Sequence, residues 1–73
     1  MDKAMILDHL AIAERHVTQG CGHIAQQKRV ILDLANGGHD TSMARSLLVS
    51  FEDVQRMHVA DRDRLKRELA KTP

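Results

Sequence analysis

Apolar residues recur at every seventh position through the first half of this chain, and the repeat continues across a place where a helix would be expected to end. One position of the repeat is filled by Leu10, Val17, Ile24 and Ile31, and its companion position by Ile6, Ala13, Gly20, Gln27 and Leu34. This is the a/d spacing of a coiled-coil seam. Gln19-Gly20-Cys21-Gly22 is typical of a turn, but a loop has no reason to preserve the phase of the repeat. We therefore predict one helix over residues 3–35.

The stop and start signals of the chain lie in the run Asn36-Gly37-Gly38-His39-Asp40-Thr41. Gly37 is predicted to take the left-handed conformation that ends a helix, and Asp40 or Thr41 to cap the next one. This places the turn at 36–40 and a second helix at 41–70. A loop this short makes the two helices antiparallel. If the glycines at 20 and 22 break the first helix, the alternative is a three-helix bundle with helices near 3–19, 22–36 and 41–70.

The second helix carries two apolar stripes. The first is Ala44, Leu48, Phe51, His58, Leu65 and Leu69, and the second is Met43, Leu47, Val54 and Met57. Folding the chain about its turn predicts that Ile24 meets Val54 and that Gly20 meets His58. A glycine opposite an imidazole gives the ring room, which offsets the cost of about 1 kcal/mol for glycine inside a helix.

A chain of 73 residues forms one domain, and a single core of this size seldom supplies more than about 3–5 kcal/mol. A lone hairpin leaves apolar side chains uncovered on both helices. Pairing two hairpins into a four-helix bundle would bury them, and two-fold dimers are the commonest oligomers. We therefore expect a homodimer whose interface contains Leu7, Met43, Leu47 and Met57.

Composition narrows the class of function. The balance of 11 Lys+Arg against 10 Asp+Glu, for a net charge of +1, argues against a dedicated nucleic-acid binder. The locally basic run Arg62-Asp63-Arg64-Leu65-Lys66-Arg67, followed by Lys71, keeps such binding as a weaker alternative. The single cysteine, Cys21, cannot form an internal disulfide, which favours a reducing compartment. With neither a secretory signal nor an apolar run long enough to span a membrane, we expect a cytoplasmic protein.

Five histidines in so short a chain raise the question of a metal site. His9, His16 and His23 are seven apart, so neighbouring rings lie about 10 Å apart along a helix and cannot share one ion. A cross-helix zinc site would draw on His16, Cys21, His23, His58 and Asp61. The pattern favours instead solvated residues along the edge of the seam, so we expect no metal and no other cofactor. We find no pattern of catalytic residues and do not expect an enzyme.

The chain resembles a group of short uncharacterised bacterial proteins of rhizobial type. The resemblance covers nearly the whole length and is carried by Ala13-Glu14-Arg15-His16-Val17, His23-Ile24-Ala25-Gln26-Gln27, Gly38-His39-Asp40-Thr41 and Asp61-Arg62-Asp63-Arg64-Leu65. Similar sequences commonly continue as charged helix after the position of Gly20, which also favours an unbroken first helix. The group has no assigned activity, so the resemblance implies no site residues.

The sequence thus predicts an all-α antiparallel hairpin acting as a small cytoplasmic self-associating interaction or regulatory module without enzymatic activity. The sequence is also compatible with binding to an unknown protein partner. The alternative is a metal-binding helical protein that uses its histidines, and the weaker alternative is a nucleic-acid-associated protein that uses its C-terminal basic run.

Overall fold

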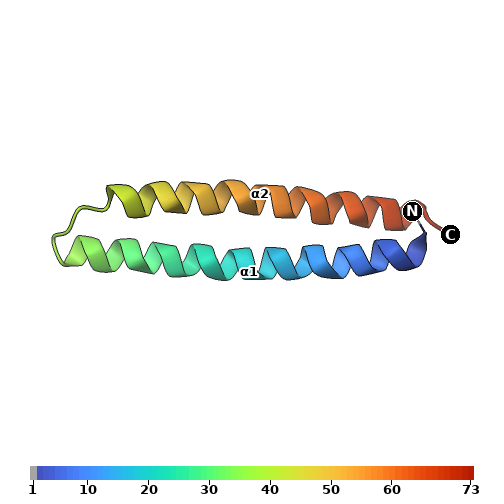
Figure 1. Ribbon diagram of the computed structural model, residues 1–73, viewed down its shortest axis with the longest axis horizontal. Helices are drawn as coiled ribbons and strands as arrows, with labels where there is room; N and C mark the ends of the chain where they lie inside the picture. The colour runs from blue at the N-terminus through green and yellow to red at the C-terminus, as the bar shows by residue number, and fades with distance from the viewer. Residues whose placement is uncertain (1) are drawn as a thin grey trace.

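The computed structural model describes residues 2–73, which form two helices joined by one loop. α1 spans Lys3–Asn36 and α2 spans Ser42–Lys71. The two helices lie side by side and antiparallel as a rod of 57 × 14 × 13 Å, with both ends of the chain at one end of the rod (Figure 1). The predicted helical hairpin is confirmed. The three-helix alternative is wrong, because α1 passes through Gly20 and Gly22 without a break.

The seam side of α1 is the one that the repeat predicts. The buried and half-buried residues of this helix are Ile6, Leu10, Ala13, Val17, Gly20, Ile24, Gln27, Ile31 and Leu34, and each occupies a position of that repeat. Gly20 therefore faces α2, whereas Gly22 faces away, with open space where a Cβ would lie. The repeat keeps its phase across the two glycines because a single helix presents the same side to its partner throughout.

α2 presents its first apolar stripe to the seam. The stripe residues are all buried or half-buried, with Leu65 the most enclosed at 2% exposure. Gln55 and Arg62 continue the heptad spacing between Leu48 and Leu69 and are also half-buried. The second stripe, Met43, Leu47, Val54 and Met57, is exposed.

α1 ends one residue later than predicted, in a Schellman motif. The His39 N–H donates to the Leu34 carbonyl at 2.9 Å, and the Gly38 N–H donates to the Ala35 carbonyl at 3.1 Å. Gly38, with φ of 74°, is the left-handed residue, so the prediction for Gly37 is wrong. Gly37 keeps a φ of −84° because its N–H still bonds to the Asp33 carbonyl.

Asp40 provides the cap of α2. Its Oδ1 accepts from the backbone N–H of Ser42 at 2.9 Å and from the Ser42 hydroxyl at 2.7 Å, and these bonds lower the pKa of the Asp40 carboxyl. Thr41 makes no side-chain bond to the helix backbone; its Oγ1 accepts from Arg45 Nε. Of the two predicted caps, Asp40 is the one that binds a free amide.

The predicted pairing of Gly20 with His58 is wrong by about one helical turn. A Cβ at Gly20 would meet the side-chain amide of Gln55, and His58 lies beside His16 instead. The reason is the path of the loop, which runs back alongside the last turn of α1 before α2 begins (Figure 1). Two glutamines hold this register: Gln27 Nε2 donates to the Ala44 carbonyl, and Gln55 Nε2 to the Val17 carbonyl, both at 2.9 Å.

Within residues 2–73, neither helix has an apolar stretch of the length and hydropathy that membrane crossing requires.

Candidate interaction face

Two rows of side chains line one edge of the seam. On α1 the row is His9, His16, His23 and Val30, each directly before a seam residue; on α2 it is Leu47, Val54, Asp61 and Glu68. A shallow groove of about 280 Å³ that is lined by His16, His23 and Val54, among others, shows that the two rows are neighbours. This edge of the hairpin is therefore a continuous surface built from both helices.

Most of the large apolar side chains that remain exposed belong to this edge or lie one turn outside it. We define the apolar face as Ile12, His16, Gln19, His23, Gln26 and Val30 on α1 with Met43, Leu47, Ser50, Val54 and Met57 on α2. None of these residues is Lys, Arg, Asp or Glu; charged residues continue the same rows beyond them, with Asp33 toward the turn and Asp61, Arg64 and Glu68 toward the chain ends. Met43 is 88% exposed and Met57 is 70% exposed. Such a long uncharged surface is typical of a protein-binding site.

The opposite edge of the seam is charged. Its residues, again at heptad spacing, are Leu7, Glu14, Cys21, Lys28 and Ala35 on α1 with Arg45, Glu52, Val59 and Lys66 on α2. Cys21 Sγ lies 3.4 Å from Gln55 Nε2 on this side. Of the four predicted interface residues, Met43, Leu47 and Met57 therefore share the apolar face, whereas Leu7 lies on the other edge.

Gly20 lines the groove in the apolar face, and the side-chain amide of Gln55 fills the space where a Cβ of Gly20 would lie. The rings of His16 and His58 lie at one side of it with centroids 4.9 Å apart, and His23 and Phe51 lie at the other with centroids 6.1 Å apart. Gln55 forms part of the floor, and its Oε1 is buried without a hydrogen-bond partner. The heptad from Leu48 through position 55 to Arg62 is the sequence signal that would have placed Gln55 here.

The structure brings together two of the candidate metal ligands. His16 and His58 are adjacent, but Cys21 is on the opposite edge and Asp61 is engaged by Arg64 at 2.6 Å. Among residues 2–73, no group of three or more histidine, cysteine or carboxylate side chains is arranged to hold one ion. The cross-helix zinc site considered from the sequence is therefore not assembled within one copy.

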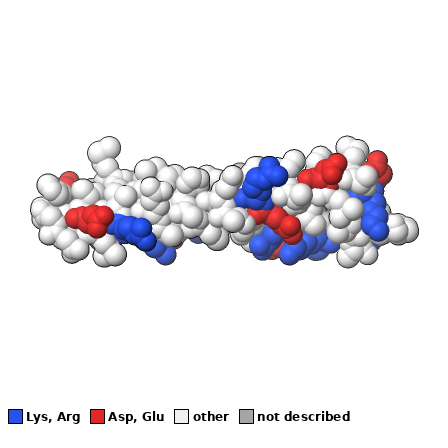
Figure 2. All heavy atoms as spheres, turned by 90° about the horizontal axis from the view of Figure 1, so that it is seen from below, with Lys and Arg blue, Asp and Glu red and all other residues white. Residues whose placement is uncertain are grey.

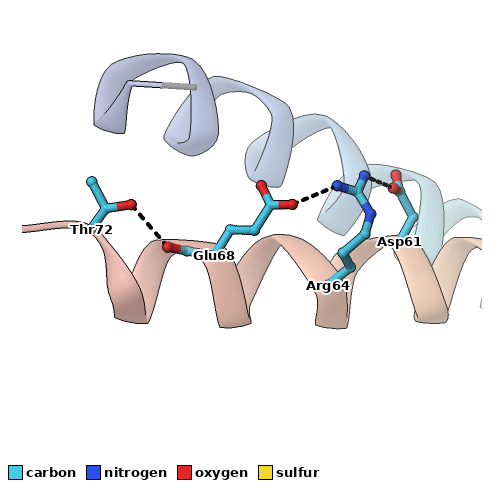
Figure 3. Close-up of polar contacts among 4 residues, drawn as sticks. All are labelled: Asp61, Arg64, Glu68 and Thr72. Carbon is cyan, nitrogen blue, oxygen red and sulfur yellow. Dashed lines mark hydrogen bonds and ion pairs between the residues drawn. The ribbon is translucent and has the colours of Figure 1, made fainter.

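Charged residues gather over the half of the rod that holds the chain ends (Figure 2). On α2, Arg64 bridges Asp61 and Glu68, at 2.6 and 2.9 Å, and the Thr72 hydroxyl donates to the Glu68 carbonyl (Figure 3). The two ion pairs raise the pKa of Arg64. Arg62 pairs with Asp63 at 3.0 Å. Two arginines of the basic run thus have carboxylate partners, and this makes the run a weaker phosphate-binding surface.

Compared with known proteins, the chain matches no family model, no curated protein and no solved structure. The geometry of the hairpin and its apolar face is therefore what bears on function.

Proposed function

We propose that this protein is a small cytoplasmic module without catalytic activity that works by self-association, two copies pairing through the apolar face into a four-helix bundle. The observation that carries the proposal is the gathering of the exposed side chains of Val30, Met43, Leu47, Val54 and Met57 on one side of the hairpin. Burying that side against a second copy removes these apolar side chains from water.

The surface area of the single hairpin supports this proposal. The chain exposes 5357 Å², whereas a globular monomer of 8.2 kDa exposes about 4,500 Å². The excess, roughly 850 Å², is close to what one partner buries in a protein–protein interface of standard size. The buried apolar core is small, comprising Ile6, Ala13, Ile31 and Leu65. A second copy would supply the core that one hairpin lacks.

Charge favours a second copy as the occupant and suggests how it is oriented. The middle of the apolar face carries no charge. Asp33, which follows Ile12, Gln19 and Gln26 at heptad spacing on α1, lies near the turn, and the Asp61, Arg64 and Glu68 cluster lies toward the chain ends. A two-fold axis parallel to the rod sets the uncharged part of each copy against the same part of the other. It also brings together two clusters that each contain both signs of charge. An axis perpendicular to the rod would set charges against Met43 and Leu47.

Leu47 and Leu7 offer a matched test, because they are 45% and 46% exposed on opposite edges of the seam. Leu47→Glu places a carboxylate inside the proposed interface, whereas Leu7→Glu places one on the charged edge. In sedimentation equilibrium we expect wild type and Leu7→Glu to be dimers at micromolar concentration. Leu47→Glu should raise the dimer dissociation constant by roughly 10-fold or more, equivalent to about 1.4 kcal/mol.

A wild-type protein that stays monomeric at high micromolar concentration would overturn the proposal. So would dissociation of the Leu7→Glu dimer with retention of the Leu47→Glu dimer, because this would assign the interface to the other edge. Helical circular dichroism of both variants shows whether the hairpin itself is intact.

A further inference from the structure

The pair formed by His16 and His58 has the dimensions of a chelating pair. Its ring centroids are 4.9 Å apart and its ring planes are inclined by 50°. Two imidazoles that each place a nitrogen about 2.0–2.1 Å from one zinc ion, at a tetrahedral angle, have centroids roughly 5 Å apart. The rings come from different helices, so the fold of the hairpin itself brings them to this spacing.

The pair is incomplete within one copy. Structural zinc sites are four-coordinate, and among residues 2–73 no third histidine, cysteine or carboxylate joins the two rings. Asp61 lies one turn beyond His58, but its carboxylate accepts from Arg64. Any further protein ligand must come from another molecule.

The pair lies where a second molecule would meet it. His16 belongs to the apolar face, and both rings line the groove that opens onto that face. In a dimer with its two-fold axis parallel to the rod, each residue lies at the same height as its counterpart. The two His16–His58 pairs then face one another across the axis.

We propose that His16 and His58 of two copies together form a four-histidine zinc site on the two-fold axis of the dimer. This inference rests on the proposed function. Neutral imidazole nitrogen is a preferred zinc ligand, and four such ligands complete a tetrahedron. Arg64 and Arg67 line a neighbouring pocket together with His58. The charge of Arg64 is balanced by its ion pairs with Asp61 and Glu68. Zinc bound at this place joins the two copies and strengthens their association.

The experiment uses untagged, metal-free full-length protein and titrates it with Zn²⁺ by calorimetry. We expect one zinc per two chains, and a dimer dissociation constant lowered by roughly 10-fold or more at saturating zinc, reversed by EDTA. With Co²⁺ as a spectroscopic probe, we expect the intense visible absorption of a tetrahedral ion without the near-ultraviolet band of a thiolate ligand. That band would implicate Cys21 and overturn the four-histidine site.

His16→Ala and His58→Ala should each abolish the tight one-to-two binding, and His9→Ala, one heptad earlier on the same edge, should retain it. His16 is exposed, so its variant keeps the hairpin intact even where the His58 variant does not. If the metal-free protein is a dimer but binds no zinc, the zinc site is overturned and the self-association stands. The same conclusion follows if His16→Ala binds zinc as tightly as wild type does. A protein that is monomeric with and without zinc overturns both.

Discussion

Gly20 and Gly22 are two residues apart on α1, yet their surroundings differ completely. Gly20 faces the seam, where a Cβ would meet the side-chain amide of Gln55, and that amide donates to the Val17 carbonyl. Gly22 faces solvent, with nothing within 4 Å of a Cβ. The same substitution at the two sites therefore separates the intrinsic cost of glycine in a helix from the packing reason for keeping it.

Gly22→Ala should stabilise the hairpin by about 0.8–1 kcal/mol, the usual difference between alanine and glycine inside a helix. For a domain of this size, that raises the melting temperature by about 4–8 °C. Gly20→Ala should gain nothing or lose stability, because the new methyl group displaces Gln55 from its hydrogen bond. Thermal unfolding at fixed protein concentration compares the two.

The double variant Gly20→Ala with Gln55→Ala serves as the control. Without the glutamine side chain, alanine at position 20 has room, so its helix-stabilising effect should reappear relative to Gln55→Ala alone. Equal stabilisation by Gly20→Ala and Gly22→Ala in the wild-type background would show that Gln55 does not occupy the space above Gly20.

At the level of the helices, the start of α2 depends on a titrating cap. The hydrogen bonds from Ser42 lower the pKa of Asp40 in the folded state, whereas the pKa of an unfolded aspartate is about 3.9. At pH values between the lower, folded pKa and about 3.9, the unfolded chain therefore binds more protons at Asp40 than the folded chain does. The contribution of the cap is complete above about pH 3.9 and is lost as the pH falls through the lower, folded pKa.

Asp40→Asn keeps a capping oxygen but does not titrate. We expect its urea midpoint to fall less than that of wild type between pH 7 and pH 3. Thr41→Ala, which removes no bond to a backbone amide, should keep the wild-type pH dependence. Identical acid profiles for wild type and Asp40→Asn would contradict the assignment of Asp40 as the cap.

The sequence predicts which residues form the seam better than it predicts which residue of α1 lies opposite which residue of α2. Seam positions follow from the heptad alone, and the heptad predicts correctly the seam residues of α1 from Ile6 to Leu34. Register depends on the path of the loop, and no residue between Gly37 and Thr41 reveals that the chain turns back along α1. The sequence allows His58 to approach either His16 or His23 across the seam, and only the observed register shows that it lies beside His16. The heptad also does not show which edge of the seam a flanking residue lies on, because both edges have the same spacing, and Leu7 lies on the edge opposite Met43.

At the scale of the whole molecule, the orientation of the two copies can be measured with spin labels. A label at Pro73→Cys, with Cys21→Ser to remove the native thiol, reports the distance between the C-terminal ends of two chains. A two-fold axis parallel to the rod should bring the labels to within the width of a four-helix bundle. A perpendicular axis would separate them by about the rod length of 57 Å. The longer distance would also exclude the four-histidine site.

Both chain ends emerge at the same end of the rod, and this determines how the hairpin responds to mechanical load (Figure 1). A force that pulls the two ends apart acts first on the layer nearest them, where Ile6 packs against the last turns of α2, and reaches the next layer only after the first has opened. The two helices would then separate layer by layer from the chain ends, at low force and in steps. The hydrogen bond of Gln55 would break first and that of Gln27 after it.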